Sequence, residues 1–124
     1  MKEIIYTPNA PEPIGPYSQA YFVNDILYCS GQIPVDPQTG NVVEGGINEQ
    51  TLQCIKNIKE VLSAANLNFE NVVKTTCFLS NMSDFSSFNS VYEEYFVSKP
   101  ARSCVAVKEL PKNVLVEIEV IATK

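Results

Sequence analysis

Two amphipathic segments, each flanked by short β-rich runs, constrain the fold of this chain more than any other feature of its sequence. The first is predicted to have Asn48 as its N-cap and Glu49 in its first turn, where the helix dipole favours a carboxylate. Ile47 and Leu52 have the spacing of a hydrophobic staple, and Asn66 suits the left-handed conformation that ends a helix. Apolar residues recur every three to four positions, at Leu52, Ile55, Ile58, Leu62 and Ala65. The pattern predicts a helix with one apolar stripe.

The second amphipathic segment is predicted to run from about Ser83 to Phe96, because Pro100 cannot continue a helix. Its stripe is aromatic and consists of Phe85, Phe88, Tyr92, Tyr95 and Phe96. An aromatic stripe at helical spacing is typical of a face that packs into a core. Asn89 lies beside these rings, either as a solvated side chain or as part of a site.

The β-rich runs are residues 21–23, 26–29, 72–79, 103–107 and 114–122. Asn24 and Asp25 suit a tight hairpin turn, and prolines at 8, 11, 13 and 16 predict an extended or turning start. The predicted order is two strands, a helix, a strand, a helix and two strands. Two helices with one apolar stripe each must cover a single face of a sheet. The fold class is therefore α+β, and the other face of the sheet needs a partner, for which we expect another copy of the chain.

The overall composition restricts the function classes. The 124 residues suit a single domain over 1–124, and the net charge of −5 with no basic run is unlike a nucleic-acid-binding surface. The sequence has no histidine, which excludes the Ser-His-Asp triad, the Cys-His dyad and the mixed Cys/His zinc finger. Acid–base chemistry therefore falls to Glu, Asp, Lys, Tyr, Cys or water.

The cysteines and the N-terminal region indicate the compartment. Four cysteines, at Cys29, Cys54, Cys77 and Cys104, lie far apart in apolar stretches and form no close pair. This pattern predicts reduced, mostly buried thiols, and no metal site is expected. No run is long enough for a membrane-spanning helix, and prolines and an acid stand where a signal peptide needs an apolar core. We therefore expect a cytoplasmic protein.

The residues best suited to chemistry lie in the C-terminal quarter. On the last predicted strand, Glu117 and Glu119 point to one face, between Leu115 and Ile121, while valines and an isoleucine point to the other. The two carboxylates either face water, or at least one is held in a cleft with a shifted pKa. Arg102 precedes another strand, and its planar guanidinium either grips a carboxylate through two hydrogen bonds or forms a surface ion pair.

Five segments, in order along nearly the whole chain, resemble the RidA/YjgF family, whose members are also labelled endoribonuclease L-PSP or translation inhibitor. The longest segment is PARSCVAVKELPKNVLVEIE at residues 100–119. The others are IGPYSQ at 14–19, CSGQIPVDPQTG at 29–40, VVKTTCFL at 72–79 and NSVYEEYF at 89–96. Several of these segments are turns or strands that carry little information alone, but their agreement in the right order identifies the chain as similar to this family.

The resemblance implies a chorismate-mutase-like α+β fold, in which a mixed β-sheet carries two helices on one face and three copies assemble with clefts between subunits. It also implies cofactor-free hydrolysis of 2-imino acids, such as 2-iminopropanoate and 2-iminobutanoate, to 2-oxo acids and ammonia. In the family, these imines arise from enamines released by pyridoxal-phosphate-dependent dehydratases. By this resemblance, Arg102 clamps the substrate carboxylate, and Glu117 positions or deprotonates the attacking water.

Four further positions match the family's pocket: Tyr17, Ser30, Asn89 and Cys104. The resemblance implies that the Ser30 hydroxyl and main-chain groups near Cys104 hold the imine end or its water, and that Tyr17 of an adjacent subunit closes the pocket. Two other functions remain open from the sequence. One is a nuclease or translation inhibitor, and the other is a non-catalytic ligand-binding or chaperone-like trimer.

The sequence departs from the family pattern just before Arg102. The segment Val97–Lys99 is shorter than usual, and Lys99 stands before Pro100 where many members have an aromatic residue. Three consequences are open: a more open pocket, a different substrate size preference, or an added charge at the mouth.

Overall fold

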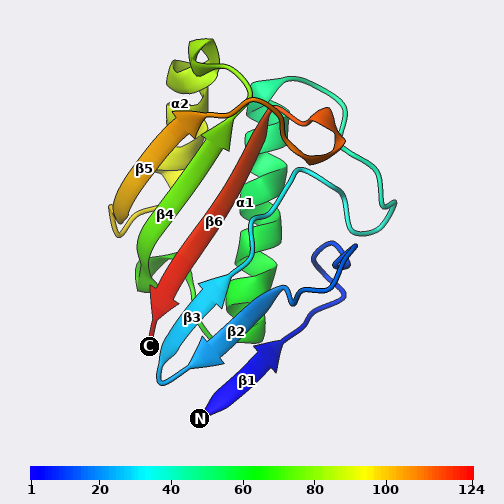
Figure 1. Ribbon diagram of the computed structural model, residues 1–124. Coiled ribbons are helices and arrows are strands. Elements are labelled where there is room, and N and C mark those ends of the chain that lie inside the picture. The colour runs from blue at the N-terminus through cyan, green and yellow to red at the C-terminus, as the bar shows by residue number, and fades with distance from the viewer.

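A six-stranded mixed sheet with two helices on one face is the architecture of the computed structural model, which describes all 124 residues (Figure 1). The elements are β1 (Lys2–Ile5), β2 (Ala20–Val23), β3 (Ile26–Cys29), α1 (Ile47–Ala64), β4 (Val72–Leu79), α2 (Phe85–Tyr95), β5 (Ala101–Ala106) and β6 (Val116–Thr123). The strand order is β1-β2-β3-β6-β4-β5, and only β4 and β5 run parallel. The predicted α+β class is confirmed, and no helix has the length and apolar character needed to cross a bilayer.

The C-terminal strand β6 lies at the centre of the sheet, antiparallel to both neighbours. Tyr28 of β3 pairs with Ile121, and Phe78 of β4 pairs with Glu117. The predicted hairpin between β2 and β3 is confirmed: Asn24 and Asp25 have φ values of 48° and 68°, as a two-residue type I′ turn requires. β6 therefore joins the N-terminal hairpin to the β4–β5 pair.

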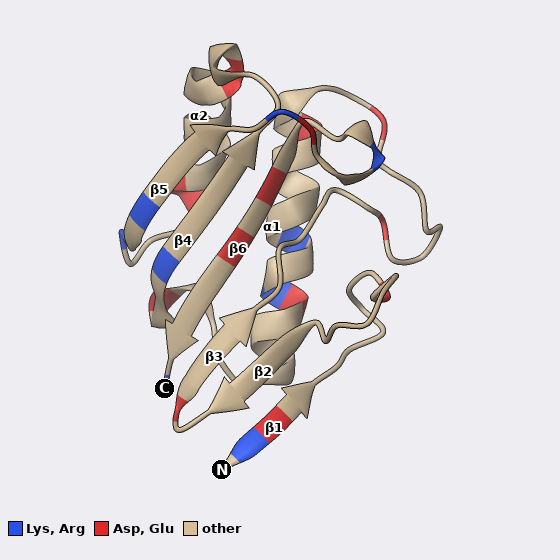
Figure 2. Cartoon of the chain, in the orientation of Figure 1, with Lys and Arg blue, Asp and Glu red and all other residues tan.

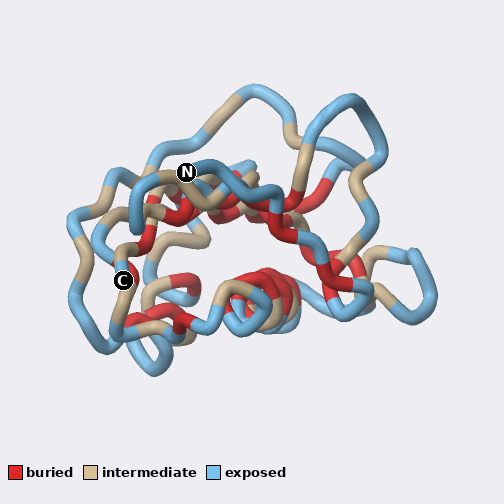
Figure 3. Tube along the Cα trace, turned by 90° about the horizontal axis from the view of Figure 1, so that it is seen from below, coloured by how far each residue is buried: buried red, intermediate tan, exposed pale blue.

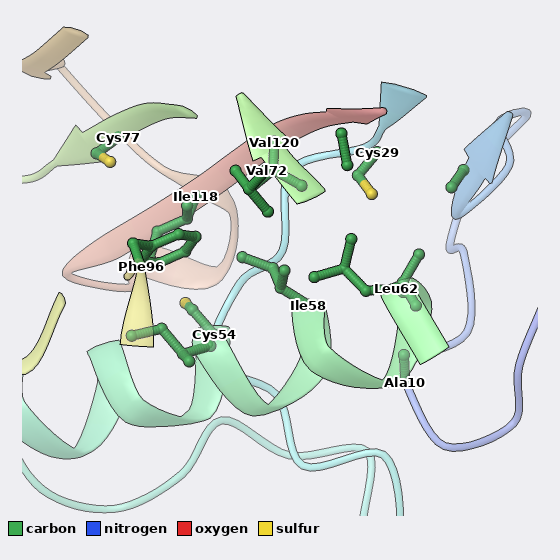
Figure 4. Close-up of a cluster of buried hydrophobic side chains, with 14 of the residues drawn as sticks. Ala10, Cys29, Cys54, Ile58, Leu62, Val72, Cys77, Phe96, Ile118 and Val120 are labelled. Carbon is green, nitrogen blue, oxygen red and sulfur yellow. The ribbon is translucent and has the colours of Figure 1, made fainter. Parts of the chain in front are cut away.

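The core lies between the sheet and the helices, which form two layers when seen end-on (Figure 3). Val116, Ile118 and Val120 of β6 are buried, and Figure 4 shows Ile118 and Val120 on the sheet side of the core, across from Ile58 and Leu62 of α1. Burial of each such side chain contributes about 1.5–3 kcal/mol. The predicted alternation along β6 is confirmed, and its polar positions face away from the helices.

Three cysteines are fully part of this core, and the fourth is half-buried. Cys29, Cys54 and Cys77 are buried, Cys104 is intermediate, and all four are free thiols. Burial raises the pKa of Cys29 and of Cys77 to about 12. The prediction that the cysteines are mostly buried is confirmed.

The start of α1 differs from the prediction. The helix begins at Ile47 with Gly46 as its N-cap, because Glu49 Oε1 accepts the Gly46 N–H at 2.8 Å. This contact caps the helix two residues before the predicted Asn48, so Ile47 is the first helical residue and does not form the expected staple with Leu52. At the other end, Asn66 has φ 60°, which confirms the predicted left-handed stop.

The other boundaries differ by a few residues. A 3₁₀ turn over Met82–Asp84 precedes α2, because Asn81 Oδ1 accepts the Ser83 N–H at 2.8 Å and caps that turn first. Tyr95 was predicted in the buried stripe but is exposed; it is the last residue of α2, and its ring centre lies 6.2 Å from that of Phe69. The run predicted at 103–107 is β5, which begins at residue 101, and the run predicted at 114–122 begins at 116. Strand β1 was not predicted, because it is a four-residue edge strand with two charged residues.

Candidate functional site

Glu117 lies in a cleft of about 430 Å³ formed by the N-terminal loop, the segment after β3 and the turn before β6. Tyr17, Ser30, Gly31 and Lys112 also line this cleft. The structure therefore brings together three of the predicted site residues, Tyr17, Ser30 and Glu117, within one chain. We call this cleft the glutamate half-site.

The Glu117 carboxylate is packed against the main chain of Gly31. A methyl group built at Gly31 would lie 2.0 Å from Glu117 Oε2, so only glycine leaves room for the carboxylate in this position. The backbone is fixed at the residues that follow Gly31 and Glu117, because Gln32 and Ile118 exchange backbone hydrogen bonds of 2.8 and 3.1 Å. Burial raises the pKa of Glu117, and the negative charge of Glu119 raises it further. The half-buried carboxylate is thus held in place and is a stronger base than a solvated glutamate.

Ser30 is oriented by the loop across the cleft. Its Oγ donates to the Ser18 carbonyl at 2.6 Å, and its backbone N–H donates to the Gln19 carbonyl at 2.9 Å. The hydroxyl oxygen therefore keeps its lone pairs for a donor in the cleft. Gln19 was not predicted as a site residue, yet it holds this loop by bonding to the backbone of Thr7 and Pro11. Gln19 can hold the loop because its side chain is buried, and the sequence around it, between Ser18 and Ala20, gives no sign of that burial.

Arg102 lies in a different place, between β5 and α2. Its Nη1 donates to Asn89 Oδ1 at 2.7 Å, and its Cζ lies 4.8 Å from the centre of the Tyr92 ring and 5.5 Å from that of Phe85. Tyr92 is fixed in turn by a 2.7 Å hydrogen bond between its hydroxyl and Thr75 Oγ1. Cation–π contacts and the bond to Asn89 hold the guanidinium plane and leave its other N–H groups free to bind a ligand.

An open cavity of about 640 Å³ lies beside Arg102, and we call it the arginine half-site. It is lined by Asn89, Tyr92, Glu93, Phe96, Val97, Lys99, Pro100 and Arg102. The half-buried thiol of Cys104 lies two residues further along β5; burial raises its pKa, and the positive charge of Arg102 partly offsets this. Asn89, Arg102 and Cys104 therefore form a second group of predicted residues.

The two groups lie on opposite faces of the sheet. Arg102 pairs with Thr75, which pairs with Val120, so Arg102 shares the helix-covered face. Glu117 has the opposite parity on β6 and faces away from the helices. The two positions are also separated by two strand spacings and three residues, roughly 10 Å in each direction. Figure 2 shows the basic position near the start of β5 apart from the acidic positions on β6. A single chain therefore does not bring Arg102 and Glu117 into one pocket.

The face of the sheet without helices carries large exposed apolar side chains. Ile4, Tyr21 and Tyr28 form a continuous row across β1, β2 and β3, which ends at Ile121 of β6. Val105 of β5 lies on the same face, in the row that contains Glu117. Tyr28 is 47% exposed and Ile4 57% exposed, whereas their sequence neighbours Ile5 and Leu27 on the helix side are buried. An exposed apolar surface of this kind is typical of a protein interface.

Comparison with known proteins gives consistent matches over the whole chain. Residues 7–124 match a family model described as Endoribonuclease L-PSP. A RutC family protein of Pyrococcus horikoshii is 54% identical over 125 residues, covering 100% of this chain and 99% of that protein. A human protein named 2-iminobutanoate/2-iminopropanoate deaminase is 46% identical over 123 residues, covering 98% of this chain and 90% of that protein. A solved structure from Yersinia pestis, a protein of unknown function of the Rid family, has a TM-score of 0.96 and 52% identity, with 100% of both chains covered.

Proposed function

Because this chain belongs to the Rid/YjgF family, whose sequence model is described as Endoribonuclease L-PSP, we propose that it hydrolyses 2-imino acids to 2-oxo acids and ammonia. The observation that carries the proposal is the half-buried Glu117 carboxylate, held against Gly31 in a cleft beside the Ser30 hydroxyl. The human relative named 2-iminobutanoate/2-iminopropanoate deaminase supports small 2-imino acids as the substrates. No cofactor is part of the proposal, and we place the activity in the cytoplasm.

The proposed active site is composite, and a homotrimer supplies both parts. In this arrangement Tyr17, Ser30 and Glu117 of one subunit face Arg102 and Cys104 of the next, so that each interface holds one complete site. The opposite orientations of Arg102 and Glu117 support this, because a single chain cannot bring both to one small substrate. The apolar face of the sheet supports assembly, since burial of Ile4, Tyr21 and Tyr28 stabilises the contact between copies.

In the proposed reaction, Arg102 holds the substrate carboxylate through N–H groups that Asn89 does not occupy. The Ser30 oxygen accepts a hydrogen bond from the protonated imine nitrogen. Glu117 takes a proton from a water molecule as the water oxygen forms a bond to the imine carbon. The resulting carboxylic acid then gives that proton to the nitrogen, the C–N bond breaks, and the Glu117 carboxylate takes the hydroxyl proton as the carbonyl forms. The products are a 2-oxo acid and ammonia, and the raised pKa of Glu117 suits both proton transfers.

A coupled assay tests this function directly. An L-amino-acid oxidase generates 2-iminopropanoate from alanine or 2-iminobutanoate from 2-aminobutyrate, and a semicarbazide trap reports how much imine remains. We expect the protein to shorten the imine lifetime in proportion to its concentration. A trap yield that is independent of protein concentration for every imine tested would refute the proposed function.

The family description also mentions endoribonuclease activity, and the site offers less for that chemistry. No histidine is available as a general acid or base, and the formal net charge of −5 disfavours binding to phosphates. We therefore propose small 2-imino acids, and not nucleic acid, as the partners of this protein. RNA binding measured against salt concentration distinguishes the two, since binding through phosphate contacts weakens steeply as salt rises.

A further inference from the structure

Two lysines adopt a backbone conformation that lysine rarely takes. Six non-glycine residues have a positive φ, and four of them are Asn or Asp, which tolerate the left-handed region. The other two are Lys99, with φ 51°, and Lys112, with φ 56°. Lys99 lines the arginine half-site and Lys112 lines the glutamate half-site. Because an asparagine or glycine would fit these backbone positions better, a disfavoured lysine at each cleft indicates that the side chains serve the site.

The turn that carries Lys99 is fixed on both sides. The Lys99 N–H donates to the Phe96 carbonyl at 3.1 Å, and Ser98 Oγ donates to the Val72 carbonyl at 2.7 Å. Pro100 follows and restricts the backbone further. Residues 99 and 102 are at most about 10 Å apart along an extended chain, so the four-carbon side chain of Lys99 can reach the ligand that Arg102 binds. Lys99 and Arg102 line the same cavity, so the Lys99 amine can reach a ligand bound by the guanidinium.

The charges that line the arginine half-site do not balance. Lys99 and Arg102 are the cations, and Glu93 is the one carboxylate among the lining residues. A substrate with a single carboxylate neutralises the excess charge but gives only one of the two cations a ligand. A substrate with two carboxylates provides one for each cation, and the Glu93 side chain is exposed to solvent.

We propose that Lys99 selects 2-imino acids that carry a second carboxylate, the imines of dicarboxylic amino acids. Arg102 binds the carboxylate next to the imine carbon, and Lys99 binds the distal one. This inference rests on the hydrolytic function proposed above and defines the substrate class of that same site.

The test compares two imines made in situ: 2-iminosuccinate from aspartate by an aspartate oxidase, and 2-iminopropanoate from alanine by an L-amino-acid oxidase. The measured quantity is the ratio of kcat/KM for the two substrates. We expect wild type to favour 2-iminosuccinate, and Lys99→Met to lower the ratio about tenfold, as loss of a partly desolvated ion pair predicts. Lys99→Arg retains the charge and should keep most of the preference, and Lys59→Met on the outer side of α1 is the matched surface control.

Each other outcome is decisive. A ratio that Lys99→Met leaves unchanged refutes the role of Lys99, and a ratio that falls only with Lys112→Met places the distal carboxylate in the glutamate half-site instead. Hydrolysis of 2-iminopropanoate without any preference in wild type refutes the dicarboxylate specificity while the proposed function stands. No hydrolysis of either imine refutes both. Lys99→Asn controls for folding, because asparagine suits φ 51° and should not lower the melting temperature.

Discussion

A single methyl group added at Gly31 should disable the Glu117 carboxylate without disturbing the fold. The new Cβ would lie 2.0 Å from Glu117 Oε2 and 2.9 Å from its Cδ. Since side-chain atoms do not approach a Cβ more closely than about 3 Å, the carboxylate must retreat by at least about 1 Å. A displacement of this size costs about a hundredfold in rate, or about 2.7 kcal/mol of transition-state stabilisation. The atom displaced is the end of a flexible side chain, so the cost in folding stability should be about 1 kcal/mol.

The assay is steady-state hydrolysis of 2-iminopropanoate by wild type and Gly31→Ala, each checked for melting temperature and assembly. Gly46→Ala is the matched control, because a methyl group there meets nothing within 4 Å. A double-mutant cycle separates displacement of Glu117 from simple blockage of the cleft. If the methyl acts through Glu117, Gly31→Ala has no further effect when Glu117 is already alanine. A near-wild-type kcat in folded Gly31→Ala, or an equal loss in both backgrounds, would refute the reasoning.

Four other predictions follow from the composite site. Glu117→Gln should lose far more activity than Glu119→Gln at matched folding. The reverse order would show that Glu119, and not Glu117, is the base. The pKa of Glu117 is raised in the folded protein, so the folded state becomes less stable relative to the unfolded state as pH rises from the ordinary carboxyl pKa through the raised pKa. Glu117→Gln removes this loss of stability. Its melting temperature should therefore exceed that of wild type at pH 7 but not at pH 3, where the carboxyl group is protonated in both states. Arg102→Lys and Arg102→Ala should lower kcat/KM tens- to thousands-fold. Arg102→Ala should also lose about 1 kcal/mol of folding stability, because the guanidinium no longer contacts the aromatic rings and Asn89. Near-wild-type rates in folded Arg102→Ala would refute the carboxylate clamp. Light scattering at micromolar concentration should give about three times the 13.7 kDa of the chain, and a clean monomer would contradict the composite site.

Local patterns in the sequence predicted the parts of the fold that depend on local physics. The two-residue hairpin, the left-handed stop at Asn66 and the alternation along β6 all follow from backbone preferences and side-chain period. The start of α1 did not follow, because Glu49 caps it from within the helix and the sequence offered Asn48 as a conventional alternative. Edge strand β1 was missed because it is only four residues long and its two charged residues precede two isoleucines without alternation.

The site was predicted as a set of residues but not as an arrangement. Parity along β6 placed Glu117 and Glu119 on one face, as found. The face that Arg102 occupies depends on the pairing of β5 with β4, in which Arg102 lies beside Thr75. Pairing between distant strands is a tertiary property that local sequence does not encode, so the separation into two half-sites emerged only from the structure. Asn89 was predicted as a pocket residue, and the structure gives it the more specific contact with Arg102.

The central position of β6 has a consequence for how the chain acquires its fold during synthesis. The hairpin β2–β3 forms from adjacent residues, and the β4–β5 pair can form once α2 is made, but neither half contacts the other through the sheet until β6 is available to join them. Closing these long loops carries an entropic cost that the earlier segments cannot repay alone. The nascent chain therefore leaves the facing edges of β3 and β4 unpaired until β6 has been made, and unpaired strand edges of this kind favour aggregation.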